Sequence, residues 1–174
     1  MQKRLPALVL LGRDAQAFSI WTLIHLEASV SGEDLVTLRS RPTVGILPQT
    51  YDEEIRKTSH GDQVLQKLDA LAKDVHHAGP SSVVDRAREA ATAILIAYLD
   101  TPGKDLGDLC NHQILKDEKK AIVTAAASIV ARLHGRDKSA EKSRRSLPDI
   151  VDQDAELAVL CVGTILRDLG WAEW

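Results

Sequence analysis

The stretch KKAIVTAAASIVARLHG, residues 119–135, indicates the fold of this chain. Its apolar residues recur every three or four positions, which is the spacing of one face of a helix. That face is made of Ile122, Ala126, Ile129 and Leu133. The small side chains over residues 125–128 would allow a neighbouring helix to approach closely, and Gly135 is a typical residue just beyond a helix end. The stretch therefore predicts a helix packed against other helices.

The composition of the whole chain favours the same architecture. The chain has 174 residues, of which 44% are hydrophobic but only 3% aromatic. A core built from Leu, Ile, Val and Ala suits closely packed helices better than a sheet, because sheets favour aromatic and β-branched side chains. We expect an all-α fold, a bundle of about six helices in one main domain.

Helical periodicity continues through the second half of the chain and defines the expected helices. They cover residues 52–57, 62–77, 83–99, 105–114, 117–135 and 152–169. Residues 83–99 are the most apolar, so we expect them to form the central helix, capped by Ser81 or Ser82. The polar stripe of this helix consists of Asp85, Arg88, Glu89 and Thr92. Asp152 is expected to cap the last helix.

The first 50 residues are expected to form a separate element. Residues 5–30 carry apolar side chains at helical spacing, and Ser31-Gly32 would end that helix. The spacing is carried by Ala17, Ile20, Trp21, Ile24 and Ala28. Residues 32–50 contain Pro and Gly between short apolar pieces, so a loop or two very short strands are both compatible, and we favour the loop. We therefore divide the chain into residues 1–50, an N-terminal helix and irregular segment packed on the bundle, and residues 51–174, the helical domain.

Cysteine usage and the apolar runs bear on compartment and metal binding. Cys110 and Cys161 stand 51 positions apart without a CxxC partner, as expected for reduced core thiols of a cytoplasmic protein. The apolar run at residues 5–11 is followed by Arg13 and Asp14, which does not fit a signal peptide, and we expect no membrane span. Cys110 and His112 are two positions apart, a spacing that does not direct both side chains to one metal, so we expect no cofactor.

A basic run follows the helix of residues 119–135. Residues 132–145 have a net charge of +4 and residues 146–174 a net charge of −5, within a chain whose total is −3. Several guanidiniums in one loop can hold a phosphate or RNA backbone, whereas a solvated loop balanced by the acidic last helix is the alternative. The candidate phosphate- and RNA-binding residues are Arg136, Lys138, Arg144 and Arg145.

His134 lies between Arg132 and Arg136, and this triplet is the candidate catalytic site. A histidine can give or take a proton near neutral pH, and neighbouring arginines could stabilise an anionic phosphorane. The alternative is that His134 interacts with the last carbonyl groups of its helix. Spacing leaves both interpretations open.

Three segments resemble the abortive-infection C-terminal domains of the HEPN superfamily. GPSSVVDRAREAATAILIAYL (79–99) resembles their central helix, AIVTAAASIVARLHGRDKS (121–139) the following helix with its Arg and His-Gly-Arg loop, and SLPDIVDQDAELAVLCVGTILRDL (146–169) their last helix. The resemblance covers about residues 79–170. It implies an all-α, often dimeric protein of phage-defence or toxin–antitoxin systems, many of which are metal-independent ribonucleases.

The resemblance also implies roles for individual residues. His134 would be the catalytic histidine, Arg132 and Arg136 its arginine partners, and Glu89 the glutamate of the central helix. In the family motif four to six residues separate an arginine from the histidine that follows it, but residues 127–130 here are Ala, Ser, Ile and Val. The function that the resemblance implies is a metal-independent endoribonuclease that uses His134 with Arg132 and Arg136. The alternative is a catalytically silent helical module that dimerises or binds a protein partner of the same defence system.

Overall fold

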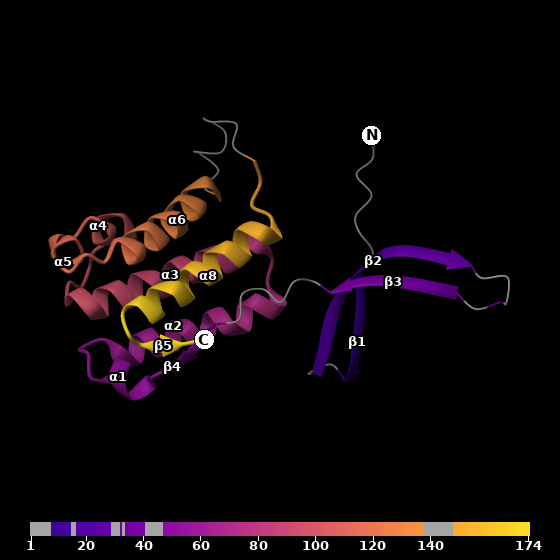
Figure 1. Cartoon of the computed structure of the whole chain (residues 1–174), viewed down its shortest axis with the longest axis horizontal. Coiled ribbons are helices and arrows are strands. Elements are labelled where there is room, and N and C mark those ends of the chain that lie inside the picture. Colours follow the sequence, from indigo (N-terminus) through magenta and orange to yellow (C-terminus); the bar gives the residue numbers. More distant parts are fainter. Residues whose placement is uncertain (1–7, 15–16, 29–31, 33, 41–46, 138–147) are drawn as a thin grey trace. The chain divides into compact units, whose positions relative to one another are not determined.

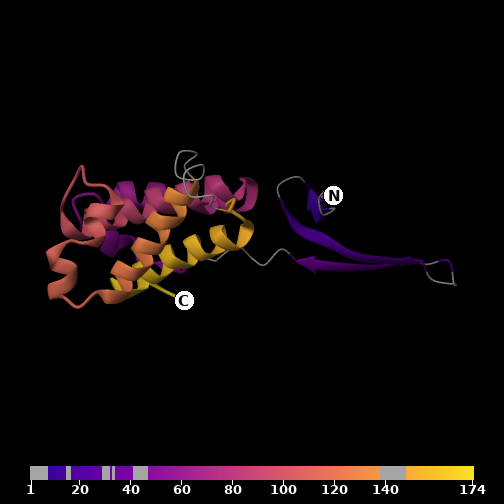
Figure 2. The same cartoon turned by 90° about the horizontal axis from the view of Figure 1, so that it is seen from above.

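The chain forms two compact units, Met1–Thr43 and Val44–Trp174. The computed structural model describes residues 8–14, 17–28, 32, 34–40, 47–137 and 148–174 (Figures 1 and 2). The boundary falls within the segment 32–50, which contains Pro and Gly between short apolar pieces, and lies seven residues before the predicted division after residue 50. The predicted packing of the first segment on the bundle stays a prediction.

The N-terminal unit contains an antiparallel sheet with the strand order β1-β2-β3. The strands are β1 (Leu8–Asp14), β2 (Ala17–Ala28) and β3 (Asp34–Ser40). The predicted N-terminal helix over residues 5–30 is therefore wrong where the structure describes it, and so is the loop favoured over residues 34–40. The strand alternative was correct for Leu35–Leu38.

The sequence of β2 explains this error. Its segment FSIWTLIHL, residues 18–26, is rich in aromatic and β-branched residues, which favour strands. Every second residue from Phe18 to Leu26 is Phe, Ile, Thr, Ile or Leu, a period of two that matches a strand. The same residues also satisfy a helical spacing, and the helical interpretation took no account of their β-propensity.

The second unit is an all-α bundle, as predicted, organised around α3 (Pro80–Leu99). This helix packs against α2 (Gly61–His77), α4 (Leu106–Cys110), α6 (Ala121–Asp137) and α8 (Asp152–Asp168) (Figure 1). Its buried residues extend around most of its circumference, which confirms its prediction as the central helix. The core is aliphatic: among the described residues no polar or charged residue is buried.

Helix α3 begins earlier than the sequence suggested. Gly79 is its N-cap and Pro80 occupies the first turn, where the missing N–H costs nothing. Ser81 and Ser82, the predicted caps, lie inside the first turn instead. Asp100 ends the helix in a left-handed conformation, with φ of 50°.

The connection from α3 to α6 contains two short helices, α4 and α5 (Gln113–Asp117), where one had been expected. Asp105 caps α4 by accepting a hydrogen bond from the Asp108 N–H at 2.9 Å. Asp117 ends α5 and does not open α6, because Lys119 takes a left-handed φ of 54° between the two helices.

Helix α6 differs from its prediction in phase and in length. Its buried face is Val123, Ala126, Ala127, Val130 and Leu133. Ile122 and Ile129, predicted on that face, are exposed. The helix also continues through Gly135 to Asp137, so Gly135 does not end it. A broad apolar composition allowed two helical phases, and packing against α3 and α8 selected one of them.

The last residues of the second unit pair with the residues that precede its first helix. β4 (Gln49–Thr50) pairs with β5 (Ala172–Glu173), and the Tyr51 N–H donates to the Trp171 carbonyl at 2.8 Å. Strand β4 is followed directly by α1 (Asp52–Arg56). Helix α8 starts at Asp152, whose predecessor Val151 is the N-cap, and Gly170 follows the helix with φ of 77°, as expected for a C-terminal glycine.

Candidate functional site

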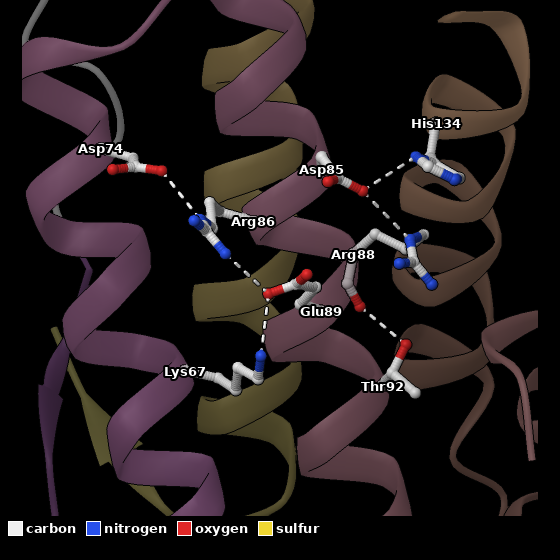
Figure 3. A network of polar contacts seen from close by, with 8 residues as sticks. All are labelled: Lys67, Asp74, Asp85, Arg86, Arg88, Glu89, Thr92 and His134. Atoms are coloured by element: carbon white, nitrogen blue, oxygen red, sulfur yellow. Dashed lines mark hydrogen bonds and ion pairs between the residues drawn. The ribbon is translucent and has the colours of Figure 1, made fainter. Parts of the chain in front are cut away.

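His134 lies in the last turn of α6 and faces Asp85 of α3. Its Nδ1 is 3.3 Å from Asp85 Oδ1, and Arg88 Nε approaches the same oxygen at 3.4 Å (Figure 3). The His134 side chain is 23% exposed, so the imidazole remains accessible from solvent. A carboxylate beside an imidazole orients the ring, an arrangement that can support proton transfer.

Arg136 points to a different helix. Its Nη2 forms an ion pair with the Asp154 carboxylate of α8, and Asp154 also accepts the Val151 N–H at 3.0 Å. Arg136 Nε is buried and has no hydrogen-bond partner among the described residues. The guanidinium is therefore engaged in joining α6 to the start of α8.

Arg132 is exposed and lies one turn before Arg136, on the same side of α6 as Arg136. Residues two positions apart on a helix are separated by about 200°, so Arg132 and Arg136 cannot share a face with His134 while α6 stays helical. The structure thus does not bring the predicted triplet together. The three side chains could have come together if the helix had ended before His134, but α6 continues to Asp137.

Glu89 lies on α3 but faces α2. Its Oε2 accepts from Lys67 Nζ at 3.0 Å and from Arg86 Nη1 at 3.1 Å, and Arg86 Nε also donates to Asp74 at 2.8 Å (Figure 3). The hydrogen bond from Lys67, with a further contribution from Arg86, holds the pKa of Glu89 below its usual range. Glu89 consequently stabilises the contact between α2 and α3 and does not reach His134.

The polar stripe predicted on α3 is divided between two neighbours. Asp85 contacts His134 of α6 and also pairs with Arg88, whereas Glu89 contacts Lys67 of α2 (Figure 3). Thr92 donates its hydroxyl to the Arg88 carbonyl at 2.7 Å within the helix. Sequence reasoning missed Asp85 as the partner of His134, although it lies in the same stripe one turn before Glu89. It also missed Asp154, which no local pattern links to Arg136.

Lys138, Arg144 and Arg145 lie outside the described residues, so the predicted phosphate-binding loop stays a prediction. Within residues 132–137, the described end of the basic segment, Arg136 is paired with a carboxylate and Asp137 accepts a hydrogen bond from Ser81 at 2.9 Å. The charge of Arg136 is therefore balanced by a carboxylate of α8.

The two cysteines are free thiols buried in the core, as predicted. Burial raises the pKa of both Cys110 and Cys161, which keeps them protonated and unreactive. His112 caps α5, its Nδ1 accepting from the Ile114 N–H at 3.4 Å, and does not join Cys110. No group of three or more His, Cys, Asp or Glu side chains suited to a metal ion occurs among the described residues.

Comparison of the chain with protein-family models, curated proteins and solved structures finds no match. Among the described helices, none combines the length and apolar character required to cross a bilayer. By its fold and its site, the second unit is an all-α bundle with an aliphatic core and a partly buried His134–Asp85 pair.

Proposed function

We propose that this chain is a HEPN-like helical protein of a bacterial phage-defence or toxin–antitoxin type system, and that it acts as a catalytically silent interaction module. One observation carries the silent assignment: His134 and Arg136 pair with carboxylates of two different helices, α3 and α8. Phosphate stabilisation requires guanidiniums aimed at the same atoms as the acid–base group, and this arrangement separates them.

An exposed apolar surface on α6 and α8 supports the interaction role. Arg136 pairs with Asp154 at one end of these helices, and Lys120 Nζ donates to the Asp168 carbonyl at 2.6 Å at the other end. The two helices are therefore antiparallel, and Ile129 lies at about the level of Leu160. The exposed apolar residues on these helices, which we name the α6–α8 strip, are Ile122, Ile129, Leu157 and Leu160.

The spacing within the strip suits a helical partner. Ile122 and Ile129 are seven residues apart and Leu157 and Leu160 three apart, so each pair lies on one side of its helix. Exposed apolar side chains gathered on two packed helices are typical of a protein-binding surface. We assign the strip to a protein partner of the same system.

The silent assignment is tested with total RNA. The purified chain and its His134→Ala variant are incubated with RNA, with and without EDTA, and cleavage is followed by electrophoresis. We expect no cleavage above a protein-free control in any arm. Cleavage by the wild type that persists in EDTA and disappears in His134→Ala would overturn the silent assignment.

The interaction role is tested separately with the product of the neighbouring reading frame. We expect it to bind the wild-type chain and to lose affinity when Ile129 and Leu160 are both changed to Asp. Ile114→Asp on α5 is the matched control, because Ile114 is also exposed but lies outside the strip. Equal binding by the double variant and the control would remove the strip from the proposal.

A metal-independent endoribonuclease is the second candidate, and the exposed edge of the His134–Asp85 pair favours it. In that mechanism His134 takes the proton of the attacking 2′-OH, and the last turn of α6 must unwind so that Arg132 and Arg136 can bind the same phosphate. Arg136 must first leave Asp154, so Asp154→Asn would release it and is expected to increase RNA cleavage. An unchanged or lower rate in a folded Asp154→Asn variant would contradict this candidate.

A further inference from the structure

The α6–α8 strip has a positively charged side chain beside it on α6 and a negatively charged one beside it on α8. On α6, Arg132 follows Ile129 by one turn, and on α8, Glu156 precedes Leu160 by one turn. Arg132 is exposed and Glu156 is partly exposed. Neither side chain forms an ion pair with another of the described residues. Both charges are therefore accessible to a molecule that binds the strip.

Arg132 and Glu156 lie on the two outer sides of the strip. The Ser128 side chain of α6 hydrogen-bonds to the thiol of α4, and Arg132 lies one turn after Ser128, so Arg132 is on the side of α6 toward α4 and away from α8. On α8, a side chain at Gly163 would meet Trp174, and Glu156 lies two turns before Gly163. Glu156 is therefore on the side of α8 that faces away from α6.

The two charges also lie at about the same level along the helices. The contacts at Arg136 and Lys120, which make α6 and α8 antiparallel, fix this level. Counting along both helices from these contacts places Arg132 at about the level of Glu156. Because both α6 and α8 lie between them, the two side chains do not meet within one chain.

A second copy of the chain complements this pattern. A two-fold axis parallel to the helices places α6 of each copy against α8 of the other, at the same level and in antiparallel direction. Arg132 of each copy then faces Glu156 of the other, and Ile129 faces Leu160. The apolar residues of the two strips meet between these charge pairs, and every helix has antiparallel neighbours, as in a four-helix bundle.

A two-fold axis across the helices lacks this complementarity. It places α6 against α6 and α8 against α8. When the contact is centred on the middle of the strip, Arg132 comes level with Ala126 of the other copy. Glu156 comes level with Thr164. Opposite charges do not meet in this arrangement, so the charges favour the axis parallel to the helices.

We propose that, in the absence of its partner, the chain forms a two-fold dimer in which the α6–α8 strip of each copy covers that of the other. Self-association and partner binding then compete for one surface, so the partner must separate the dimer to bind. The competition rests on the proposed function, which assigns the strip to a partner, whereas the dimer contact follows from the exposed apolar residues and the charges beside them. The predicted homodimer thereby acquires a defined contact.

Charge reversal tests the contact in the full chain. A dimer of Arg132→Glu copies brings carboxylates together at both charge pairs, and a dimer of Glu156→Arg copies brings guanidiniums together. We expect either change to raise the dimer dissociation constant, measured by sedimentation equilibrium, about tenfold. An equimolar mixture of the two variants restores both charge pairs and should recover most of the wild-type affinity. Lys116→Glu on α5, an exposed position outside the strip, is the matched control and should have little effect.

Mixed crosslinking tests the direction of the two-fold axis. In the proposed dimer, the cysteine of an Arg132→Cys copy faces that of a Glu156→Cys copy, whereas two copies of one variant place their cysteines on opposite sides of the dimer. We expect a short bismaleimide to join a mixture of the two variants and to leave each variant alone largely uncrosslinked. The wild type is the control, because its native cysteines are buried.

Competition is measured by adding the product of the neighbouring reading frame to the dimer. We expect the mixed crosslink to be lost as this partner binds. A wild-type chain that stays monomeric, or a mixture of charge variants that associates no better than either alone, would overturn the dimer without affecting the proposed function. A partner that binds the strip without separating the dimer would overturn the competition. A dimer with the expected charge response that binds no partner would support the dimer contact and contradict the proposed function.

Discussion

His134 Nδ1 lies 3.3 Å from Asp85 Oδ1 and joins the last turn of α6 to the first turns of α3. Arg88 shares the same carboxylate, and Ser81 donates to Asp137 at 2.9 Å between the same two helices. His134, which the sequence predicted to be catalytic, thus helps to hold α6 and α3 together at this end of the bundle.

The first prediction concerns the strength of that contact. His134→Ala and Asp85→Asn are each expected to lower the free energy of unfolding by about 0.5–1 kcal/mol, because the pair is partly exposed and screened by water. The effects of the two changes should not add, since either one removes the same interaction. Urea denaturation of both single variants and the double variant measures the coupling. Fully additive losses would mean that the pair contributes nothing.

The second prediction is a loss of stability in acid through Glu89. Because the pKa of Glu89 is lowered in the folded protein, the unfolded chain binds this proton more readily. Its stabilising contribution is therefore present above the ordinary glutamate pKa and disappears as the pH falls through the folded value. Glu89→Gln should lower the free energy of unfolding at pH 7 by about 0.5–1 kcal/mol.

The difference between wild type and Glu89→Gln should shrink as the pH is lowered toward 3, when measured by urea denaturation across the range. Asp69→Asn is the control, because the ion pair of Asp69 among the described residues is with the exposed Lys73 on the same helix. A pH-independent difference for Glu89→Gln would contradict the assigned role of its charge.

The third prediction contrasts two glycines. A Cβ at Gly163 of α8 would lie 2.8 Å from Pro48 Cδ and 3.0 Å from the Trp174 indole, so Gly163→Ala must displace the chain termini of the bundle. We expect a loss of about 1–3 kcal/mol, as for overpacking of a core. At Gly135 of α6 a Cβ meets nothing within 4 Å, and Gly135→Ala should stabilise the helix by about 0.5–1 kcal/mol.

Thermal unfolding of these two variants beside the wild type measures the contrast. The midpoint should fall for Gly163→Ala and rise for Gly135→Ala. Equal shifts of the midpoint in the same direction would mean that the close contacts of Gly163 with Pro48 and Trp174 do not limit the side chain at position 163.

The fourth prediction concerns the thiols. Cys110 and Cys161 are buried and their pKa values are raised by burial, so both should react slowly with a thiol reagent in the native protein. Both should react at once in denaturant. Rapid modification of one thiol in the native state would show that its helix opens locally.

Local patterns determined most of the helical unit. Apolar spacing and turn residues placed α2, α3 and α8 within a few residues, because helix formation depends on neighbours three and four positions apart. The same information could not decide the phase of α6, since Ile122 and Val123 are both apolar and only contact with other helices buried one and exposed the other. In β2 the pattern satisfied both periods, and β-propensity was the signal that distinguished them.

The sequence by itself determined that the larger part of this chain would be an aliphatic all-α bundle around residues 83–99. Only the tertiary structure decided the environments of His134 and Arg136, because Asp85 and Asp154 reach these two residues from other helices. Arg132, His134 and Arg136 are neighbours in sequence, yet a helix that continues to Asp137 places His134 on the side opposite the two arginines.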